Sequence, residues 1–588
     1  MTPVHSLVLF EEKSVKIINM PSRFVPRMGL RRFFAAAALS AALAGAGWSA
    51  AQAATDAAKE HTLSGNFLAG EHARAISDHS ATADFLSAVL AKNPDDQELL
   101  QTTLLALVHE GRFAEALPIA QRLDKQGVDA DVVTLVLGIN EFKQGNSKAA
   151  IDLINKLPKG GLNEFAKPLI LCWLYLADDK LEQGRQALAP LGANESVKLL
   201  HDLTLALLND VGGDKAGAKQ SYAGLTTKPE GLSFRTVELA LNYFLRQGDA
   251  PAAEKLLQDF DNAYPDNALV GLLRPQLKKK AHPLIANERD GLAESFYSIA
   301  AGLNTEGAEQ PAMLFTQLAL DLKGDLPAAQ LMRGDLLMAG ERYDDAVEAY
   351  RRVDKASAYS WNARQKMAEA LDKLNRGDEA VKILQDMTDE RTDVADAALA
   401  LGNLLRSKER FAEAAVAYNK MIERIGEIKP HHWTLFYYRG IAEERSDQWN
   451  LAEADFKKAL ELDADQPYVL NYLAYTWVTR KENLDQALQM LAKAVEQRPE
   501  DGYIVDSLGW AYYMVGNYDK AVEILEHAVE FEPTDSEINE HLGDAYWKTG
   551  RHEEAKFQWR RALSFEPKQE RVAPLQSKLD SGLSDNPT

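Results

Sequence analysis

The side chains that could perform chemistry are few and widely separated in this sequence. Cys172 is the single cysteine and lies in the apolar stretch LILCWLYL, with no cation beside it to lower the pKa of its thiol. We therefore expect a buried structural thiol. His431 and His432 follow a turn proline, and His72 and His79 are seven residues apart. Neither pair has the HExxH spacing of a zinc site, so the sequence predicts no metal and no cofactor.

Acidic residues are abundant, but their spacing sets no pair apart. The formal net charge of −21 disfavours a nucleic-acid partner, and the run Lys278–Lys280 fits a solvated bend better than a basic patch. The sequence has no glycine-rich phosphate loop, no GxSxG motif and no candidate triad. We therefore expect a protein that is not an enzyme, unless folding brings together an acid pair that the sequence hides.

A secretory signal is predicted near the N-terminal end. Two arginines precede the apolar run Phe33–Gly47, and an A-x-A sequence ends at Ala53. This order predicts a signal peptide cleaved after Ala53, with Met20 or Met28 as possible start residues. No other stretch approaches the roughly 18 apolar residues of a membrane helix. We expect a periplasmic or secreted protein with no membrane span in the mature chain.

The elements that would position any site follow from an internal repeat. Gly509 and Gly543 are 34 residues apart, and so are Pro533 and Pro567. A second small residue follows most of the repeated positions after twelve residues. Such a pattern predicts two helices that cross closely, because only a short side chain lets two backbones approach. The repeated position is occupied by Gly70, Leu104, Gly138, Cys172, Ala206, Ala240, Ala300, Gly334, Ala368, Gly402, Gly440, Ala474, Gly509 and Gly543.

This repeat resembles the tetratricopeptide (TPR) family, whose pattern is matched by Leu542, Gly543, Tyr546, Ala555, Trp559 and Pro567. Asn539 stands where the family pattern has tryptophan. The resemblance is specific from about residue 293 and looser over 63–260. It implies an all-α TPR solenoid, in which antiparallel helix pairs stack on their neighbours in a right-handed superhelix.

Breaks in the repeat predict the organisation of the chain. We expect two subarrays with a bend near 266–292, where Pro275 and Pro283 interrupt the helical pattern. The predicted segments are an N-terminal extension and signal peptide (1–53), a degenerate N-terminal TPR array (54–265), an irregular connector (266–292), a C-terminal TPR array (293–567), and a capping helix and tail (568–588).

In the TPR family the first helix of each pair lines a concave surface where peptides bind. On a helical wheel, the positions away from the packing seam are rich in aromatic residues in the last four repeats. Tyrosine and tryptophan on a face that the fold need not bury indicate binding. The alternative is that a tightly wound superhelix buries these rings against its own neighbours. The predicted binding residues are Tyr437, Tyr438, Tyr468, Asn471, Tyr472, Tyr475, Tyr503, Asp506, Trp510, Tyr513, Glu540, Asp544 and Trp547.

The partner is expected to be a protein or an extended peptide. Some family members grip an acidic tail with lysine and asparagine, but the equivalent positions here hold Asp506 and Trp510, or Glu540 and Asp544. A basic or apolar segment therefore fits better. The C-terminal third is similar to exported Gram-negative TPR proteins, some of which are adaptors of carboxyl-terminal processing proteases, although this chain lacks their lipid-anchoring cysteine. We expect a non-enzymatic scaffold or adaptor; a structural subunit of an envelope polysaccharide-export or secretion assembly is the alternative.

Overall fold

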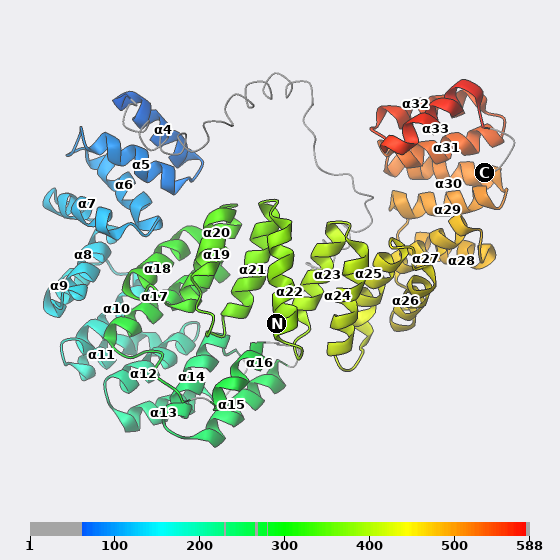
Figure 1. Ribbon diagram of the computed structural model, residues 1–588. Helices are drawn as coiled ribbons and strands as arrows, with labels where there is room; N and C mark the ends of the chain where they lie inside the picture. Colours follow the sequence, from blue (N-terminus) through cyan, green and yellow to red (C-terminus); the bar gives the residue numbers. More distant parts are fainter. Residues whose placement is uncertain (1–61, 228–230, 265–268, 279, 584–588) are drawn as a thin grey trace. The chain divides into compact units, whose positions relative to one another are not determined.

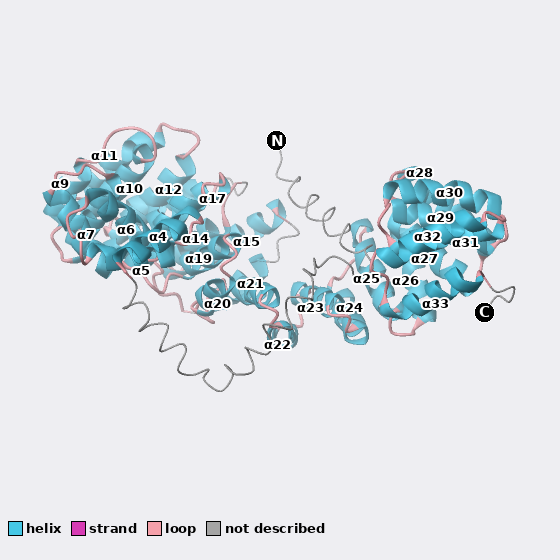
Figure 2. Cartoon of the chain, turned by 90° about the horizontal axis from the view of Figure 1, so that it is seen from above, coloured by secondary structure: helices cyan, strands magenta, loops and turns pink. Residues whose placement is uncertain are grey.

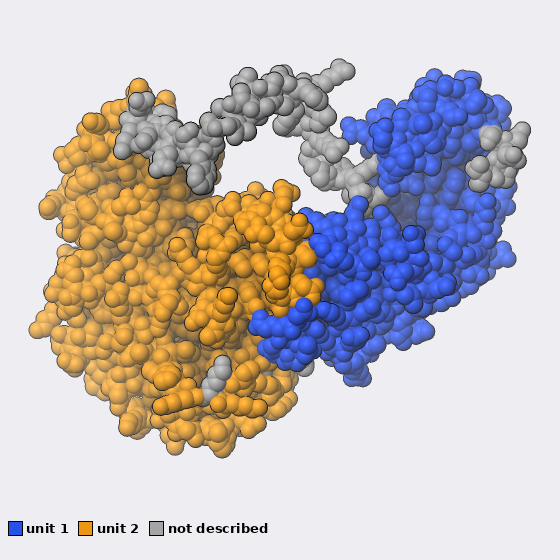
Figure 3. Space-filling model, viewed as in Figure 1, with its two compact units in different colours: residues 1–37, 388–588 blue, residues 38–387 orange. Residues whose placement is uncertain are grey.

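The computed structural model describes residues 62–227, 231–264, 269–278 and 280–583. Within these residues the chain forms 30 α-helices, two short 3₁₀ helices and no strand (Figures 1 and 2). The predicted signal peptide and its cleavage site lie outside the described residues. The described helices belong to two compact units that divide between Met387 and Thr388, here named the N-terminal unit and the C-terminal unit (Figure 3).

The N-terminal unit consists of consecutive antiparallel helix pairs, interrupted once by a short helix and a 3₁₀ turn. Its elements are α4 (Leu63–Ala75), α5 (His79–Leu90), α6 (Gln97–His109), α7 (Phe113–Lys125), α8 (Asp131–Lys143), α9 (Ser147–Asn155), α10 (Asn163–Leu176), α11 (Leu181–Gly192), α12 (Lys198–Val211), α13 (Lys215–Leu225), α14 (Phe234–Arg246), α15 (Ala250–Ala263), α16 (Leu269–Leu273), η1 (Arg274–Lys278), α17 (Glu288–Thr305), α18 (Glu309–Leu322), α19 (Pro327–Ala339), α20 (Tyr343–Arg351) and α21 (Ser360–Lys373), followed by α22 (Gly377–Glu390) across the division.

The C-terminal unit continues the helix pairs and ends in a single helix. Its elements are α23 (Asp396–Ser407), α24 (Phe411–Arg424), η2 (Pro430–His432), α25 (Trp433–Glu444), α26 (Trp449–Leu462), α27 (Pro467–Arg480), α28 (Leu484–Gln497), α29 (Gly502–Met514), α30 (Tyr518–Phe531), α31 (Ser536–Lys548), α32 (His552–Ser564) and α33 (Gln569–Ser581). The odd-numbered helices from α23 to α31 are the first helices of their pairs.

The two helices of a pair cross at the repeated small residue. A Cβ atom added to Gly334 in α19 would lie 2.3 Å from the ring of Tyr350 in α20, and one added to Gly543 in α31 would lie 2.5 Å from Trp559 in α32. Tyr350 and Trp559 are buried. The repeated glycine therefore leaves room for an aromatic ring from the partner helix, which confirms that this part of the sequence pattern is packing.

The turn inside a pair is also determined by local residues. Between α29 and α30, Gly516 has a φ of 82°, a conformation that glycine adopts without a Cβ clash. The Asn517 side chain then accepts a hydrogen bond from the Lys520 amide and caps α30. Glycine and asparagine at this place reverse the chain and start the second helix.

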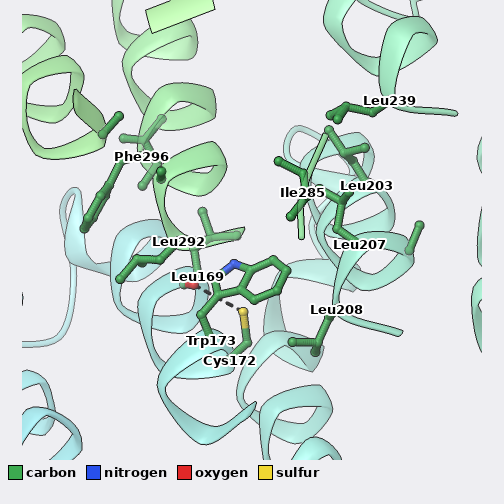
Figure 4. Packing of buried hydrophobic residues seen from close by; sticks show 14 of the residues in the cluster. Leu169, Cys172, Trp173, Leu203, Leu207, Leu208, Leu239, Ile285, Leu292 and Phe296 are labelled. Atoms are coloured by element: carbon green, nitrogen blue, oxygen red, sulfur yellow. Dashed lines mark hydrogen bonds between the residues drawn. The ribbon is translucent and has the colours of Figure 1, made fainter. Parts of the chain in front are cut away.

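The N-terminal unit departs from a simple stack, because α17 and α18 pack on the first helices of earlier pairs. Helix α17 contacts α10 and α12, and α18 contacts α6. In the close view of Figure 4, Leu292 and Phe296 of α17 lie in one apolar cluster with Trp173 of α10. The Trp173 indole donates a 2.8 Å hydrogen bond to the Ser295 hydroxyl. Helices on either side of the predicted connector therefore share a core within one compact unit.

Buried charges join the same two parts of the N-terminal unit. Arg235 of α14 donates to Glu294 of α17 at 3.0 Å and to Glu238 at 2.6 Å, and all three side chains are buried.

The described helices include no candidate for a membrane-spanning segment, since none combines the required length with enough apolar residues.

Candidate protein-binding surface

Six of the predicted binding residues form a half-buried aromatic surface on the C-terminal unit. They lie on first helices, and α27 contacts α29 just as α29 contacts α31, so the rings belong to neighbouring elements. Each ring is partly packed and partly exposed. The alternative of complete burial is therefore wrong for these residues. The aromatic surface consists of Tyr472, Tyr475, Tyr503, Trp510, Tyr513 and Trp547.

Trp510 of the aromatic surface is stacked on two neighbouring rings. Its centroid lies 4.6 Å from that of Tyr513 and 4.0 Å from that of His541, with ring planes within 15°. Asp506 and the buried His541 lie 2.9 Å apart, and this carboxylate raises the pKa of His541 to about 9 against the effect of burial. The ion pair with Asp506 therefore fixes the His541 ring on which Trp510 stacks.

Tyr472 and Tyr475 lie on the preceding first helix, α27. The Tyr472 hydroxyl donates a 3.1 Å hydrogen bond to Glu444 of α25. Burial, followed by the carboxylates of Glu537 and Asp506, raises the pKa of Tyr475. Both hydroxyls thus lie close to carboxylates, and both residues are half-buried.

Three other aromatic residues are not available to a partner. Tyr437, Tyr438 and Tyr468 are 1%, 9% and 6% exposed. Tyr437 packs edge-on against Tyr472 and close to Phe456, within the contact between neighbouring pairs. The expectation that these three rings face open surface was wrong, because the inner side of a first helix is partly covered by the next repeat.

Asn471 is also more buried than the sequence suggested for an amide on an open surface. Its side chain is only 9% exposed, and its Oδ1 atom has no hydrogen-bond partner within the described part of the chain. A buried carbonyl oxygen without a donor is unfavourable, so a donor from a bound peptide would improve the site.

The acidic residues of the predicted set are buried and already paired, which corrects the expectation that they face an open groove. Lys578 Nζ lies 2.6 Å from Glu540 and 2.6 Å from Asp544, and Arg571 also binds Glu540. Both cations come from α33. With Asp506 paired to His541, these carboxylates offer little unpaired charge to a basic peptide.

Arg571 and Lys578 were missed when the sequence was interpreted, although a signal existed. Ser577 lies 34 residues after Gly543, so the repeat numbering extends one more unit. In that numbering Arg571 and Lys578 fall on the same inner face as the predicted residues of α31. His541 has no comparable signal, since its role depends on Asp506 of the preceding repeat.

Comparison with known proteins identifies the same helical repeat that the structure shows. A family model for the tetratricopeptide repeat matches residues 336–404 and 512–579, both of which fall on the helix pairs described above. The chain therefore carries tetratricopeptide repeats in these two segments. The predicted all-α TPR solenoid is confirmed, and such a scaffold indicates a protein-binding function.

Two curated relatives and a solved structure are similar to parts of this TPR protein. The chain is 26% identical over 182 residues to TPR repeat-containing protein PA4667 of Pseudomonas aeruginosa, covering 30% of each protein. It is 27% identical over 157 residues to Superkiller complex protein 3 of Mus musculus, covering 26% of this chain but only 10% of that protein. A chain from the crystal structure of the APC/C hetero-tetramer Cut9-Hcn1 aligns at 14% identity over 88% of this chain and 96% of its own length, with a TM-score of 0.34.

This TPR protein also contains a buried acid pair that the sequence did not reveal. Arg439 binds Asp455 through two 2.6 Å contacts, and the buried Glu443 lies beside them. Burial and the Asp455 charge raise the pKa of Glu443 to about 7. The pair lies in the packing of α25 on α26, where the arginine already occupies the Asp455 carboxylate. We interpret it as a structural element and not as an acid–base site.

Within the described residues, no group of three or more histidine, cysteine or acidic side chains could hold a metal. Cys172 is buried, and burial raises the pKa of its thiol far above the usual value. The thiol donates to the Leu169 carbonyl oxygen at 3.2 Å (Figure 4). Its surroundings therefore favour the structural role predicted from the sequence.

Proposed function

We propose that this protein is a non-enzymatic periplasmic scaffold whose C-terminal unit binds a protein partner through the aromatic surface. The observation that carries the proposal is the half-burial of six aromatic rings on adjacent first helices. Tryptophan and tyrosine dominate interface energetics, because they present large rigid areas at a small entropic cost.

The inner side of the N-terminal unit supports the choice of the C-terminal unit. There, α17 and α18 already cover the first helices α6, α10 and α12. Trp173 of α10 is fully buried against α17, and its indole N–H donates a hydrogen bond to Ser295. A partner could reach those helices only by displacing part of the unit's own core.

The preferred partner is an extended, largely apolar segment. The carboxylates beside the aromatic surface are satisfied by His541, Arg571 and Lys578, so positive charge in the partner gains less than the sequence suggested. Asn471 would accept a backbone N–H of the segment. Periplasmic export and the link to a protease or cell-wall enzyme rest on the predicted signal peptide and on the similarity of the C-terminal repeats to exported adaptors.

A pull-down from envelope extract tests the proposal, using the full chain as bait. We expect one defined partner, and we expect Tyr475→Ala with Trp510→Ala to weaken the purified complex by about 30-fold or more, the effect of losing a hot spot. The matched control replaces two exposed rings on second helices, Phe531 and Phe557, with alanine. Helical circular dichroism must be the same in both double variants.

Equal binding by both double variants would refute the proposed surface, and so would a loss that appears only together with unfolding. A capture limited to subunits of an export or secretion assembly, unaffected by the aromatic substitutions, would favour the structural-subunit alternative.

A further inference from the structure

The last helix, α33, packs on the C-terminal unit through the buried Leu575 and the partly buried Leu579. Leu575 is the one side chain of α33 that is buried. Pro574 lies inside the helix, where it removes a backbone hydrogen bond and disfavours helical structure. A helix with one fully buried residue and an internal proline binds only weakly to the surface on which it packs.

The surface beneath α33, here named the acidic shelf, consists of Glu540, Asp544 and Trp547 on α31. The two carboxylates are 1% and 5% exposed. Asp544 accepts a 2.9 Å hydrogen bond from the Trp559 indole, but every cation that binds either carboxylate in the described part of the chain comes from α33. Buried carboxylates without a cation are strongly unfavourable, so the shelf requires a basic occupant.

The residues of α33 that touch the shelf follow a helical spacing. Arg571 binds Glu540, Leu575 is buried, Lys578 binds both carboxylates, and Gly582 approaches Trp547. The intervals between Arg571, Leu575 and Lys578 are four and three residues, which is one face of an α-helix, whereas Gly582, with a φ of 78°, lies just beyond the helix. A Cβ atom on Gly582 would lie 1.9 Å from the Trp547 ring, so this last position needs a residue without a side chain.

The connection to α33 is itself strained. Glu566 has a φ of 50°, which a residue with a side chain rarely adopts, and Pro567 follows it. Release of α33 would relax this residue. The strain lies in the short link and not in the shelf.

We propose that the acidic shelf is a second docking site, at which α33 is an exchangeable occupant and a basic amphipathic helix of a partner protein takes its place. The competing helix carries arginine or lysine at positions i and i+7 and leucine at i+4, and a glycine follows the end of the helix at i+11. A helix without an internal proline would form more readily than α33. The shelf shares Trp547 with the aromatic surface, but the proposal rests on Glu540 and Asp544, which are not part of that surface.

A labelled peptide tests the exchange on the full chain. The probe is a fluorescein-labelled peptide of residues 567–583 in which Pro574 is replaced by alanine, and binding is followed by fluorescence anisotropy. The variant Arg571→Gln with Lys578→Gln keeps the shelf but weakens its internal occupant. We expect this variant to bind the peptide at least about tenfold more tightly than the wild type, because its shelf is free for a larger fraction of the time.

The matched control is Arg560→Gln with Lys568→Gln, which removes two exposed cations of the same region that make no contact with the shelf. It should bind the peptide like the wild type. Adding Glu540→Gln and Asp544→Asn to the weakened variant should abolish the gain, and a peptide whose arginines and lysines are replaced by glutamine should not bind.

Three results would overturn the proposal. One is equal peptide affinity of the weakened variant and the wild type. Another is a gain that survives neutralisation of Glu540 and Asp544. The third is dimerisation of the wild type, measured by light scattering, that the peptide reverses, since the occupant would then be the α33 of a second copy.

Discussion

The same substitution, glycine to alanine, is expected to have opposite effects at two positions of the N-terminal unit. Gly334 in α19 is buried, and a Cβ atom there would lie 2.3–2.7 Å from three ring atoms of Tyr350. Gly302 in α17 is exposed, and a Cβ atom there would have nothing within 4 Å. The two sites share the helical backbone and differ in the space around them.

The expected magnitudes follow from two competing terms. Alanine is roughly 0.5–1 kcal/mol better than glycine inside a helix. At Gly302 this term acts alone, so Gly302→Ala should raise the stability of the unit by a few tenths of a kcal/mol to ~1 kcal/mol. At Gly334 overpacking costs ~1–3 kcal/mol. Tyr350 is fixed by its 2.8 Å hydrogen bond to Asp335 and cannot turn away, so Gly334→Ala should be destabilising by ~1–2 kcal/mol overall.

Thermal unfolding followed by circular dichroism, with the full chain, measures both effects. For a body of this size ~1 kcal/mol corresponds to about 1–2 °C in Tm. A second substitution, Tyr350→Leu, makes room at the crossing, so the cost of Gly334→Ala should shrink in that background. A neutral or stabilising Gly334→Ala would refute the packing explanation of the repeat, and so would a cost that stays the same in the Tyr350→Leu background.

Two further predictions concern buried charge. Glu443→Gln should remove a pH dependence of the stability of the C-terminal unit. Because the pKa of Glu443 is raised to about 7, its stabilising contribution is present below about pH 4.5 and is lost as the pH rises through about 7. The loss amounts to up to ~3 kcal/mol in the free energy of unfolding. Urea unfolding at pH 5 and pH 8 checks this, and a wild-type stability that does not fall between these values would contradict it. Arg235→Met should destabilise the N-terminal unit by about 3–5 kcal/mol, because Glu238 and Glu294 are left buried without a cation; adding Glu294→Leu should recover part of this loss, and an Arg235→Met protein that melts like the wild type would disprove the role of the cluster.

The repeat and its helix pairs could be predicted because the responsible contacts are local. Gly543 and Trp559 meet within one helix pair, so a 34-residue period and two small residues are enough to place them. The burial of Tyr437 could not be predicted in the same way, since it depends on the curvature with which one repeat covers the next. The Arg235–Glu294 pair joins residues 59 positions apart and leaves no mark on the period.

The candidate site was predicted only in outline for the same reason. The helical wheel predicted an inner face for the first helices, and Trp510 and Tyr513 of that set are half-buried. The pairing of each acidic residue depends on the helix that follows it, as with Lys578 and Asp544. A helical wheel gives the direction of a side chain but not the neighbour that it meets.

The packing of α17 and α18 on earlier first helices affects the order in which the N-terminal unit acquires its structure. Contacts in a simple solenoid join adjacent repeats, so such a chain can fold one repeat at a time. Here Arg342 binds Glu110 across 232 positions, and Gln317 binds the His109 carbonyl oxygen across 208. Because closing such long loops is slow, the apolar inner sides of α6, α10 and α12 remain exposed until α18 has been synthesised. A nascent chain should therefore need a chaperone over that interval, and truncation before α17 should yield an aggregating fragment.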